Sequence, residues 1–341
     1  EPKDYNELLW NMAVSPQLCS RLWVYRQYDY QVQTNTLLGP GSDAAVLRLK
    51  EGTGAIAMSL DGNPFFCYLN PRKGAQHAVA ESCRNLVCSG ALPLAATNCL
   101  NFANPENPEI MWQFAEAVAG IREACQFFDT PITGGNVSFY NETDGNGILP
   151  TPVIGVIGKV AKIKDVCPSS FQKTGHIVFL LGKTLSEFGG SVYLQMLGRP
   201  QEGPLPSLDM SIEKTLQDRI LSGIQIGLIR SAHDLSEGGL LFGLVESCLY
   251  SSFGLKAQLK TGEIRPDHFL LSETASRVIV TIHPDDEINF LKHFRKIPIT
   301  RVGVVTEKTL EISVNNNDLI KVSVQELKKA WESAFEEVFQ N

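Results

Sequence analysis

The sequence lacks the features of several large classes of protein. No stretch of 18 apolar residues occurs in its 341 residues, so nothing predicts a helix that spans a membrane. No basic run stands out and the formal net charge is −7, so we expect neither nucleic acid nor a membrane as a partner. The first residues are charged and amphipathic, unlike a signal peptide, and do not begin with methionine. The chain can therefore be a piece of something longer.

A paired cysteine motif is also missing. The eight cysteines form no CxxC pair, and several lie inside apolar runs such as NLVCSG at residues 85–90. This pattern is typical of buried free thiols in a reducing compartment, so we expect a cytoplasmic protein. No histidine stands in a recognisable relation to a cysteine, so no catalytic cysteine is predicted.

The common nucleotide-binding loops are absent too. The chain contains no P-loop pattern, and no GxGxxG follows a predicted strand. Any nucleotide binding must therefore use another fold. The many acidic and amide side chains favour Mg²⁺ as the ion that would neutralise phosphate, because hard cations prefer oxygen ligands.

What the sequence does contain is an alternation of strand and helix patterns, which predicts an α/β (α+β) protein of about two domains. A polar segment with Pro and Gly at residues 165–175 reads as the boundary between two such sets. The apolar spacing predicts helices at residues 4–14, 16–27, 74–88, 107–128, 211–229, 285–295 and 323–338.

Two motifs in the first set offer oxygen ligands. In GPGSDAAV, Asp43 lies between a tight turn and a strand, where it can bind Mg²⁺ or only stabilise its own turn. In AESCRN, Glu81 and Asn85 are four residues apart and share one face of a predicted helix. That face is either half of a magnesium site or an exposed polar surface.

Asparagine and glycine gather at two strand ends of the same set. Asn98, Asn101 and Asn104 follow one another in NCLNFANP, although asparagine is a poor strand former. The segment TPITGGNVSF contains Gly134 and Gly135, which would allow a phosphate close to the main chain or mark a bulge or hairpin. In that segment Asn136 can offer an oxygen to a metal ion, and Ser138 a hydroxyl to a phosphate.

The second set has two further motifs. In HDLSEGGL, Asp234, Ser236 and Glu237 precede two glycines and a predicted helix, which suits either phosphate binding or an ordinary N-cap. A base role for His233 is the alternative to a structural histidine. In SETASR, Glu273 and Arg277 form either an ion pair or, through the arginine, a phosphate contact.

These motifs occur together, in this order, in one known group. The segments GPGSDAAV, AESCRNLVCSGALPLAATNCLNFANPENPEI, TPITGGNVSFYNET, HDLSEGGL and SETASR resemble the C-terminal half of the phosphoribosylformylglycinamidine synthases of the small bacterial type. Those enzymes belong to the aminoimidazole ribonucleotide synthetase-like superfamily. The resemblance spans nearly the whole chain, and the combination is specific although each piece is not.

The resemblance implies a fold and a domain arrangement. It implies a leading helical segment at residues 1–36, a synthetase-like N-terminal domain of ATP-binding type at 37–165, a C-terminal α/β domain at 170–310, and a terminal strand and helix at 311–341. Two such halves pack as a dimer or pseudo-dimer through their β-sheets, because the strand edges of one half need cover by the other.

The resemblance also implies an activity and its residues. The family ligase uses ATP to convert formylglycinamide ribonucleotide and ammonia, supplied from glutamine by a glutaminase subunit with a small accessory subunit, in purine biosynthesis. By resemblance Asn98 and Gly135 contact nucleotide, Asn136 binds Mg²⁺ and Ser138 contacts substrate, while a second nucleotide and its metal use Asp43, Glu81, Asn85, Asp234 and Ser236. We expect all these oxygen donors to converge on a single pocket.

Two departures from the family pattern qualify these expectations. The family often has aspartate at the position of Asn98, so a direct metal role is not expected there. No His-Asn-His-Pro motif occurs, so no catalytic residue is predicted and the isolated chain is expected to be inactive without the N-terminal half, in the same or a separate chain. The isolated half could also form a homodimer. The alternatives are a stand-alone ATP-dependent kinase-like member of the superfamily and a non-catalytic nucleotide-binding scaffold.

Overall fold

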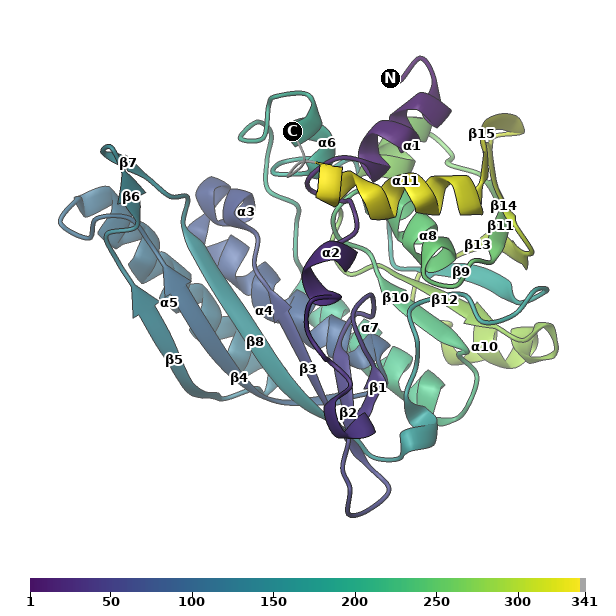
Figure 1. Cartoon of the computed structure of the whole chain (residues 1–341), viewed down its shortest axis with the longest axis horizontal. Coiled ribbons are helices and arrows are strands. Elements are labelled where there is room, and N and C mark those ends of the chain that lie inside the picture. The colour runs from purple at the N-terminus through teal and green to yellow at the C-terminus, as the bar shows by residue number, and fades with distance from the viewer. Residues whose placement is uncertain (338–341) are drawn as a thin grey trace.

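The computed structural model describes residues 1–337 and contains two α/β units side by side (Figure 1). The first unit consists of β1 (Thr36–Leu38), β2 (Ala45–Arg48), β3 (Ala55–Asp61), α3 (Pro64–Leu69), α4 (Pro71–Cys88), β4 (Leu92–Asn101), α5 (Pro108–Phe128), β5 (Ile132–Ser138), the hairpin β6 (Glu142–Thr143) and β7 (Asn146–Gly147), and β8 (Thr151–Val160). The second consists of β9 (Ile177–Leu181), α6 (Val192–Met196), α7 (Met210–Gln225), β10 (Ser231–Asp234), α8 (Gly239–Leu249), β11 (Gly254–Leu259), α9 (Pro266–Leu271), β12 (Val278–Ile282), α10 (Glu287–His293), β13 (Ile299–Thr306), β14 (Thr309–Val314), β15 (Asn317–Ser323) and α11 (Val324–Glu337).

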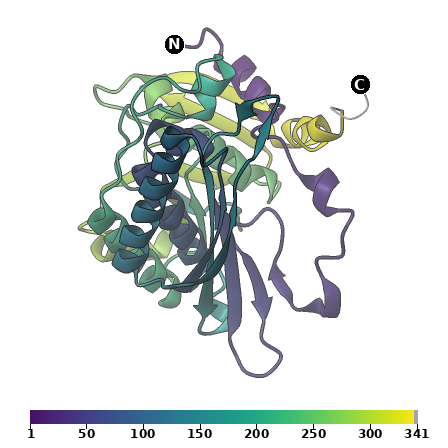
Figure 2. The ribbon, with the colours of Figure 1, turned by 90° about the vertical axis from the view of Figure 1, so that its left-hand side faces the viewer.

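The sheet of the first unit is covered on one face only. Its strand order is β1-β2-β3-β8-β4-β5, antiparallel except for the parallel pair β4–β5. Helices α4 and α5 pack on one face, where alternate strand residues such as Ala57, Ala96 and Val156 are buried. Figure 2 shows these helices on one side of the sheet and no helix of that unit on the other. The opposite face exposes Met58, Leu60 and other apolar side chains.

The sheet of the second unit is covered on both faces. Its order is β10-β12-β9-β13-β11-β14-β15, with only β11–β14 parallel. Helices α7 and α10 pack on one face, and α8, α11 and the leading helix α1 (Tyr5–Ala13) pack on the other. The central strands β9 and β12 are accordingly buried at every position, as expected for apolar runs enclosed from two sides.

Asparagine–proline pairs start the two long helices of the first unit. The side chain of Asn70 accepts a hydrogen bond from the backbone N–H of Lys73 and caps α4, and Asn107 caps α5 in the same way. A proline follows each cap at the first helical position, where its missing N–H costs nothing.

Several predicted boundaries need correction. The helix predicted at residues 16–27 is only the four-residue α2 (Leu22–Tyr25), because the backbone before it turns and the guanidinium of Arg21 donates to carbonyl oxygens of Pro16 and Cys19. The helix predicted at 211–229 ends at Gln225, since Gly227 adopts a φ of +77°. The boundary expected at residue 310 falls inside β14, which joins the second sheet beside β11.

Two further expectations can be compared with the described residues. No described helix is long and apolar enough to cross a membrane. All eight cysteines lie in this part of the chain; they are free thiols, and seven of them are buried while Cys99 is exposed.

We predict that Gly120→Ala destabilises the first unit. A Cβ atom at Gly120 would lie 2.1 Å from the carbonyl oxygen of Arg72, where α5 crosses α4. Because neither backbone can move freely, the free energy of unfolding should fall by about 1–3 kcal/mol, measured by urea denaturation. Gly134→Ala is the matched control, since nothing lies within 4 Å of its Cβ position. Equal losses in the two variants would contradict this account of the helix contact.

Candidate functional site

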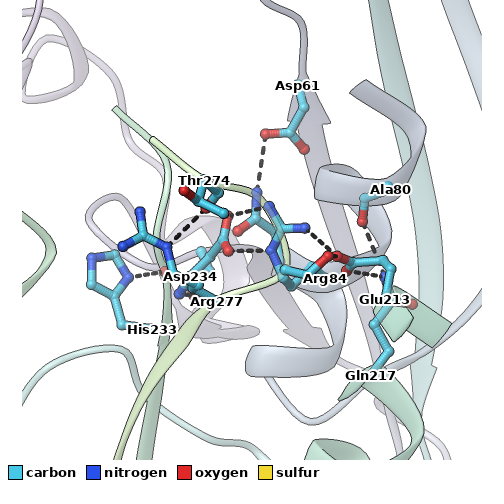
Figure 3. A network of polar contacts seen from close by, with 12 residues as sticks. Asp61, Ala80, Arg84, Glu213, Gln217, His233, Asp234, Thr274 and Arg277 are labelled. Atoms are coloured by element: carbon cyan, nitrogen blue, oxygen red, sulfur yellow. Dashed lines mark hydrogen bonds and ion pairs between the residues drawn. The ribbon is translucent and has the colours of Figure 1, made fainter. Parts of the chain in front are cut away.

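The two units are joined by a buried arginine on α4. Arg84 is 2% exposed, and its guanidinium donates to the carboxylate of Asp234 at the end of β10 and to Glu213 on α7 at 2.9 Å (Figure 3). Both carboxylates belong to the second unit. A helix of the first unit therefore places one cation between two buried anions of the second, and each charge depends on the others for compensation.

Polar side chains around this ion pair complete the junction. Gln217 donates to the carboxylate of Glu213 at 2.8 Å and to the carbonyl oxygen of Ala80 on α4 at 3.1 Å. Ser276 also donates to Glu213. These contacts satisfy the remaining oxygens of a glutamate with no exposed surface, as a buried charge requires.

The SETASR segment serves the structure of the second unit. Glu273 accepts hydrogen bonds from the backbone N–H groups of Val192 and Gly238, both at 2.8 Å. Arg277 is fully buried and donates to the carbonyl oxygen of Thr274 at 2.9 Å. Neither reading offered by the sequence holds, because the two side chains have other partners and the arginine is not presented to a ligand.

A histidine links the two units at a second point. Nδ1 of His233 lies 2.6 Å from Oδ1 of Asp43, and Nε2 lies 3.2 Å from Oε2 of Glu246. Burial alone would lower the pKa of His233, but the two carboxylates outweigh it and raise that pKa well above its ordinary value. His233 is therefore a structural cation. The other oxygen of Asp43 accepts from the backbone N–H of Asp234 at 2.8 Å.

An acidic cavity of about 250 Å³ lies beside this junction. It is lined by the end of β3, by α4 and by the loop after β10, which contribute Asp61, Glu81, Asn85, Ser236 and Glu237. Nδ2 of Asn85 donates to Oδ1 of Asp61 at 3.0 Å. Oδ2 of Asp61 is buried and has no hydrogen-bond partner among the described residues. A buried carboxylate oxygen without a donor indicates room for a cation or a donor that completes it.

The pKa values in this cavity reflect crowded carboxylates. Burial raises the pKa of Asp61 to about 7, and the charge of Asp234 adds to the shift. Burial likewise raises the pKa of Glu81 well above its ordinary value, with Glu237 and Asp61 contributing repulsion. A divalent cation would relieve both effects, because it compensates the charges that burial and repulsion disfavour.

The five residues predicted to bind metal do not form one set. Both carboxylate oxygens of Asp43 and of Asp234 already accept hydrogen bonds from protein groups. Glu81 and Asn85 face the acidic cavity, and the fifth residue, Asn136, lies apart from them on β5. Within residues 1–337 no group of three or more His, Cys, Asp or Glu side chains is placed to hold a metal ion. A metal bound here would thus need further oxygens from water or from a phosphate, which is usual for Mg²⁺.

A larger cavity of about 540 Å³ adjoins the acidic one. The two share Gly62, Asn63, Ser236 and Glu237 in their linings. The larger cavity is walled by aromatic side chains from distant parts of the chain, namely Tyr25, Tyr250 and Trp331. An apolar compartment next to an oxygen-rich one suits a molecule with an aromatic part and an anionic part.

The remaining predicted residues lie on the edge of the first sheet. In the parallel pair β4–β5, Asn98 is opposite Gly135 and Asn101 is opposite Ser138. Asn136 is exposed, while the hydroxyl of Ser138 lies 3.2 Å from the side-chain oxygen of Asn141 in the following turn. Residues 132–137 are all exposed, and β5 pairs only with β4 among the strands that the structure describes.

The two glycines of β5 have different reasons to be glycine. A Cβ atom at Gly135 would lie 2.2 Å from Oδ1 of Asn98, so the absence of a side chain lets that amide lie over the strand. At Gly134 nothing lies within 4 Å of the Cβ position. Of these two glycines, Gly135 is the one whose Cβ position is occupied by a neighbouring group, and Gly134 leaves an open space above the strand.

The expectation of a single pocket is wrong. Glu81, Asn85 and Ser236 line the acidic cavity, but Asn98, Gly135, Asn136 and Ser138 lie on the β4–β5 edge. Asp61 ends β3, which is three strands away from β5 in the sheet order. At the usual strand spacing that separates the two places by about 14 Å. The donors therefore serve two sites.

Sequence reasoning overlooked two residues of the junction and cavity. Asp61 ends a strand immediately before Gly62, a position where a side chain commonly faces a ligand cleft. Arg84 stands between Glu81 and Asn85 in the sequence, but its pairing with residues 129 and 150 positions away has no local signal.

Comparisons with known proteins identify the class. Residues 41–160 match the AIR synthase related protein, N-terminal domain, and residues 173–315 match the AIR synthase related protein, C-terminal domain. Together the matches take in most of the chain, which belongs to the AIR synthase related family and has its two-domain fold.

The individual relatives point to one kind of protein within this family. The chain is 43% identical to the phosphoribosylformylglycinamidine synthase subunit PurL of Alkaliphilus metalliredigens over 98% of its own length and 46% of that protein. It is also 43% identical to the PurL subunit of Moorella thermoacetica, over 97% and 45%. The chain thus spans about half the length of the curated relatives it matches.

Solved structures agree in fold. T. maritima PurL complexed with ATP superposes with a TM-score of 0.74 at 20% identity, covering 96% of this chain and 52% of that one. A chain of the HypE–HypF complex superposes with a TM-score of 0.63 at 17% identity, covering 89% and 99%.

We predict that Arg84→Leu is strongly destabilising. It leaves the buried carboxylates of Asp234 and Glu213 without their cation, which costs about 3–5 kcal/mol of unfolding free energy. Arg72→Leu is the control, because Arg72 pairs with Glu123 at the surface, where solvent screens the two charges. Urea denaturation measures both. A loss below 1 kcal/mol in Arg84→Leu would show that the junction does not rest on this ion pair.

We predict that stability without added metal falls as the pH rises towards 8. The pKa of Asp61 is raised from 3.8 to about 7 in the folded protein. Its contribution is therefore fully present below the unfolded pKa and is lost as the pH rises through about 7. Asp61→Asn should flatten the dependence by about 1–4 kcal/mol between pH 4 and pH 8, measured by urea denaturation. An unchanged pH profile in the variant would contradict the assignment.

Proposed function

We propose that the chain acts as the C-terminal half of a phosphoribosylformylglycinamidine synthase, the ATP-dependent ligase of purine biosynthesis that makes formylglycinamidine ribonucleotide from formylglycinamide ribonucleotide and ammonia. The sequence similarity to two PurL subunits supports this reading, over nearly all of the chain and about half of each relative. Structures described as T. maritima PurL complexed with ATP and with FGAR support the substrates. The match to PurL subunits at 43% identity over nearly all of the chain favours this proposal over a stand-alone kinase-like protein or a scaffold.

The observation that carries the proposal is an open side of the first unit. The uncovered sheet face exposes Met58, Leu60, Leu92 and Ile157, and β5 beside it has a free backbone edge among the described strands. A contiguous exposed apolar face of this kind marks a protein interface. We propose that the N-terminal half of the synthase, in the same or a separate chain, covers it, and that a homodimer forms when that half is absent.

The catalytic site would then lie where the partner half meets the β4–β5 edge. There Asn98 and Gly135 contact ATP, Asn136 binds Mg²⁺ and Ser138 contacts the substrate. Bound Mg²⁺ would supply neutralisation of phosphate charge. The chain's own contribution is positioning, because its amide and hydroxyl groups can orient phosphate and substrate but cannot replace a general base. Catalytic acid–base residues would come from the other half.

A second nucleotide is proposed for the junction of the two units. The acidic cavity offers Asp61, Glu81 and Asn85 to Mg²⁺, with Ser236 near the phosphates, and the adjoining cavity offers aromatic walls for a base. The unpartnered Oδ2 of Asp61 fits a cation at this place. The resemblance assigns Asp43 and Asp234 to the same metal. We propose instead that they support the site indirectly, because their contacts hold the two units together.

The proposal includes the partners and compartment of such an enzyme. A glutaminase subunit and a small accessory subunit would supply ammonia, in line with a T. maritima assembly described as PurLQS that superposes with a TM-score of 0.72. Eight free thiols agree with a reducing cytoplasm.

Complementation tests the proposal. We expect the purified chain to show no turnover alone and to gain ATP hydrolysis that depends on formylglycinamide ribonucleotide and ammonia when a matched N-terminal half is added. Gly134→Val should assemble normally but lose at least tenfold in kcat/KM, because it fills the open space over β5. Leu60→Asp, at a position 75% exposed, should keep the fold but fail to assemble.

The controls separate assembly from chemistry. Size-exclusion chromatography measures association, and circular dichroism checks folding of each variant. Absence of turnover in a complex that demonstrably forms would refute the proposed activity. Full activity of Gly134→Val would instead show that the β5 edge is not part of the catalytic site.

A further inference from the structure

A basic hollow lies on the second unit, away from the sheet edge and the junction. It has a volume of about 520 Å³ and is formed by the C-terminal part of α7, the turn after it and the end of α10. Its lining contains three basic side chains, Arg219, Lys292 and Arg295, together with His293. Its apolar wall consists of Ile226 and Leu228.

The cations of the basic hollow lack internal counter-charges. No carboxylate contributes to the lining, and no ion pair involves Arg219, Lys292 or Arg295 in the described part of the chain. The neighbouring acidic residues are engaged elsewhere: Asp218 pairs with Lys214 at 2.9 Å, Asp286 with Arg230 at 3.1 Å and Glu287 with Arg301 at 3.4 Å.

This concentration of positive charge runs against the composition of the protein. The sequence has 30 Lys and Arg against 37 Asp and Glu. Like charges held around one hollow repel each other, and the repulsion is relieved when an anion occupies the space between them. Interaction with the partial negative charges at a helix C-terminus accounts for Lys292 and His293 in the last turn of α10, but α7 has no basic residue in its last turn, so Arg219 needs another reason.

Hydrogen bonds fix the floor of the hollow. Nε2 of His293 lies 2.9 Å from the carbonyl oxygen of Arg219 and 3.1 Å from the hydroxyl of Ser222. Since a carbonyl oxygen only accepts, Nε2 must carry the proton and donate. This contact ties α10 to α7, so that cations from two elements surround a formed space.

We propose that the basic hollow binds the phosphate group of a small molecule. Guanidinium groups such as those of Arg219 and Arg295 match phosphate oxygens by paired N–H donors, and a lysine adds a point charge. The volume is that of a small-ligand site. Ile226, 63% exposed, and Leu228 form the side against which the non-polar part of a phosphate ester packs.

The test follows the δ1 methyl group of Ile226 by NMR in the full chain, at constant ionic strength. Inorganic phosphate and n-butyl phosphate are titrated separately, and each should shift this methyl signal with saturation at millimolar concentrations or below. Equal affinities would show that the phosphate group alone accounts for binding. Tighter binding of the ester would show that the apolar wall of Ile226 and Leu228 also contributes. Either result supports the proposal.

Matched variants establish which charges act. Arg219→Gln, Lys292→Gln and Arg295→Gln combined should weaken binding at least tenfold, while the buried methyl groups of Ile224 and Ile229 report an intact fold. The control combines Arg48→Gln, Lys162→Gln and Lys260→Gln, which remove the same charge at exposed positions elsewhere and should leave binding unchanged. If the triple variant unfolds, Arg295→Gln alone, at an exposed position, should weaken binding at least threefold.

Four outcomes would overturn the proposal. These are an unmoved Ile226 signal, an equal shift with chloride at matched ionic strength, undiminished affinity in the hollow variants, and a shift only with a glutamate-rich peptide. The last would make the surface a docking site for an acidic protein instead. The readout is local to Ile226, so it is independent of nucleotide binding at the other cavities and of the proposed synthase activity.

Discussion

The buried ion pair of Arg84 with Asp234 and Glu213 is the contact on which the arrangement of the molecule depends. It places a cation from α4 of the first unit among anions of the second. His233 and Asp43 form a second contact of this kind, in which the second unit supplies the cation and the first unit the anion. Taking such charges out of water is costly unless each is compensated, so the two units have one relative position that satisfies them. The acidic cavity exists because that position is fixed.

The junction also changes how the acidic residues of the family motifs are to be understood. Asp43 and Asp234 are acidic residues at the junction of the two units, but protein donors already occupy their carboxylate oxygens. Asp61 and Glu81 are the carboxylates left facing open space. Charge in this region is thus divided between holding the domains together and remaining available to a cation. Burial raises the pKa of Asp61 and of Glu81, the two carboxylates that face the cavity.

The first unit is unequal on its two faces, and this asymmetry explains the proposed division of labour. One face packs helices and resembles any domain core, whereas the other leaves apolar side chains and the β5 edge exposed. The groups implied in nucleotide, metal and substrate contacts lie on this open edge. A chain built in this way would bring positioning groups to a site that a partner completes.

The sequence by itself determined the class of fold and most of its elements. Apolar periodicity located α5 to within one residue and α4 to within three at its start, because this signal depends on neighbouring residues. The sequence could not decide that β14 extends the second sheet or that the oxygen donors divide between two places. Nor could it show that Arg84 belongs to the domain junction. Those outcomes depend on contacts between residues far apart in the sequence: Leu255 and Leu310 of the β11–β14 pair are 55 positions apart, and Arg84 lies 129 and 150 positions from its two carboxylates. Their energies come from burial and charge compensation that only the folded chain creates.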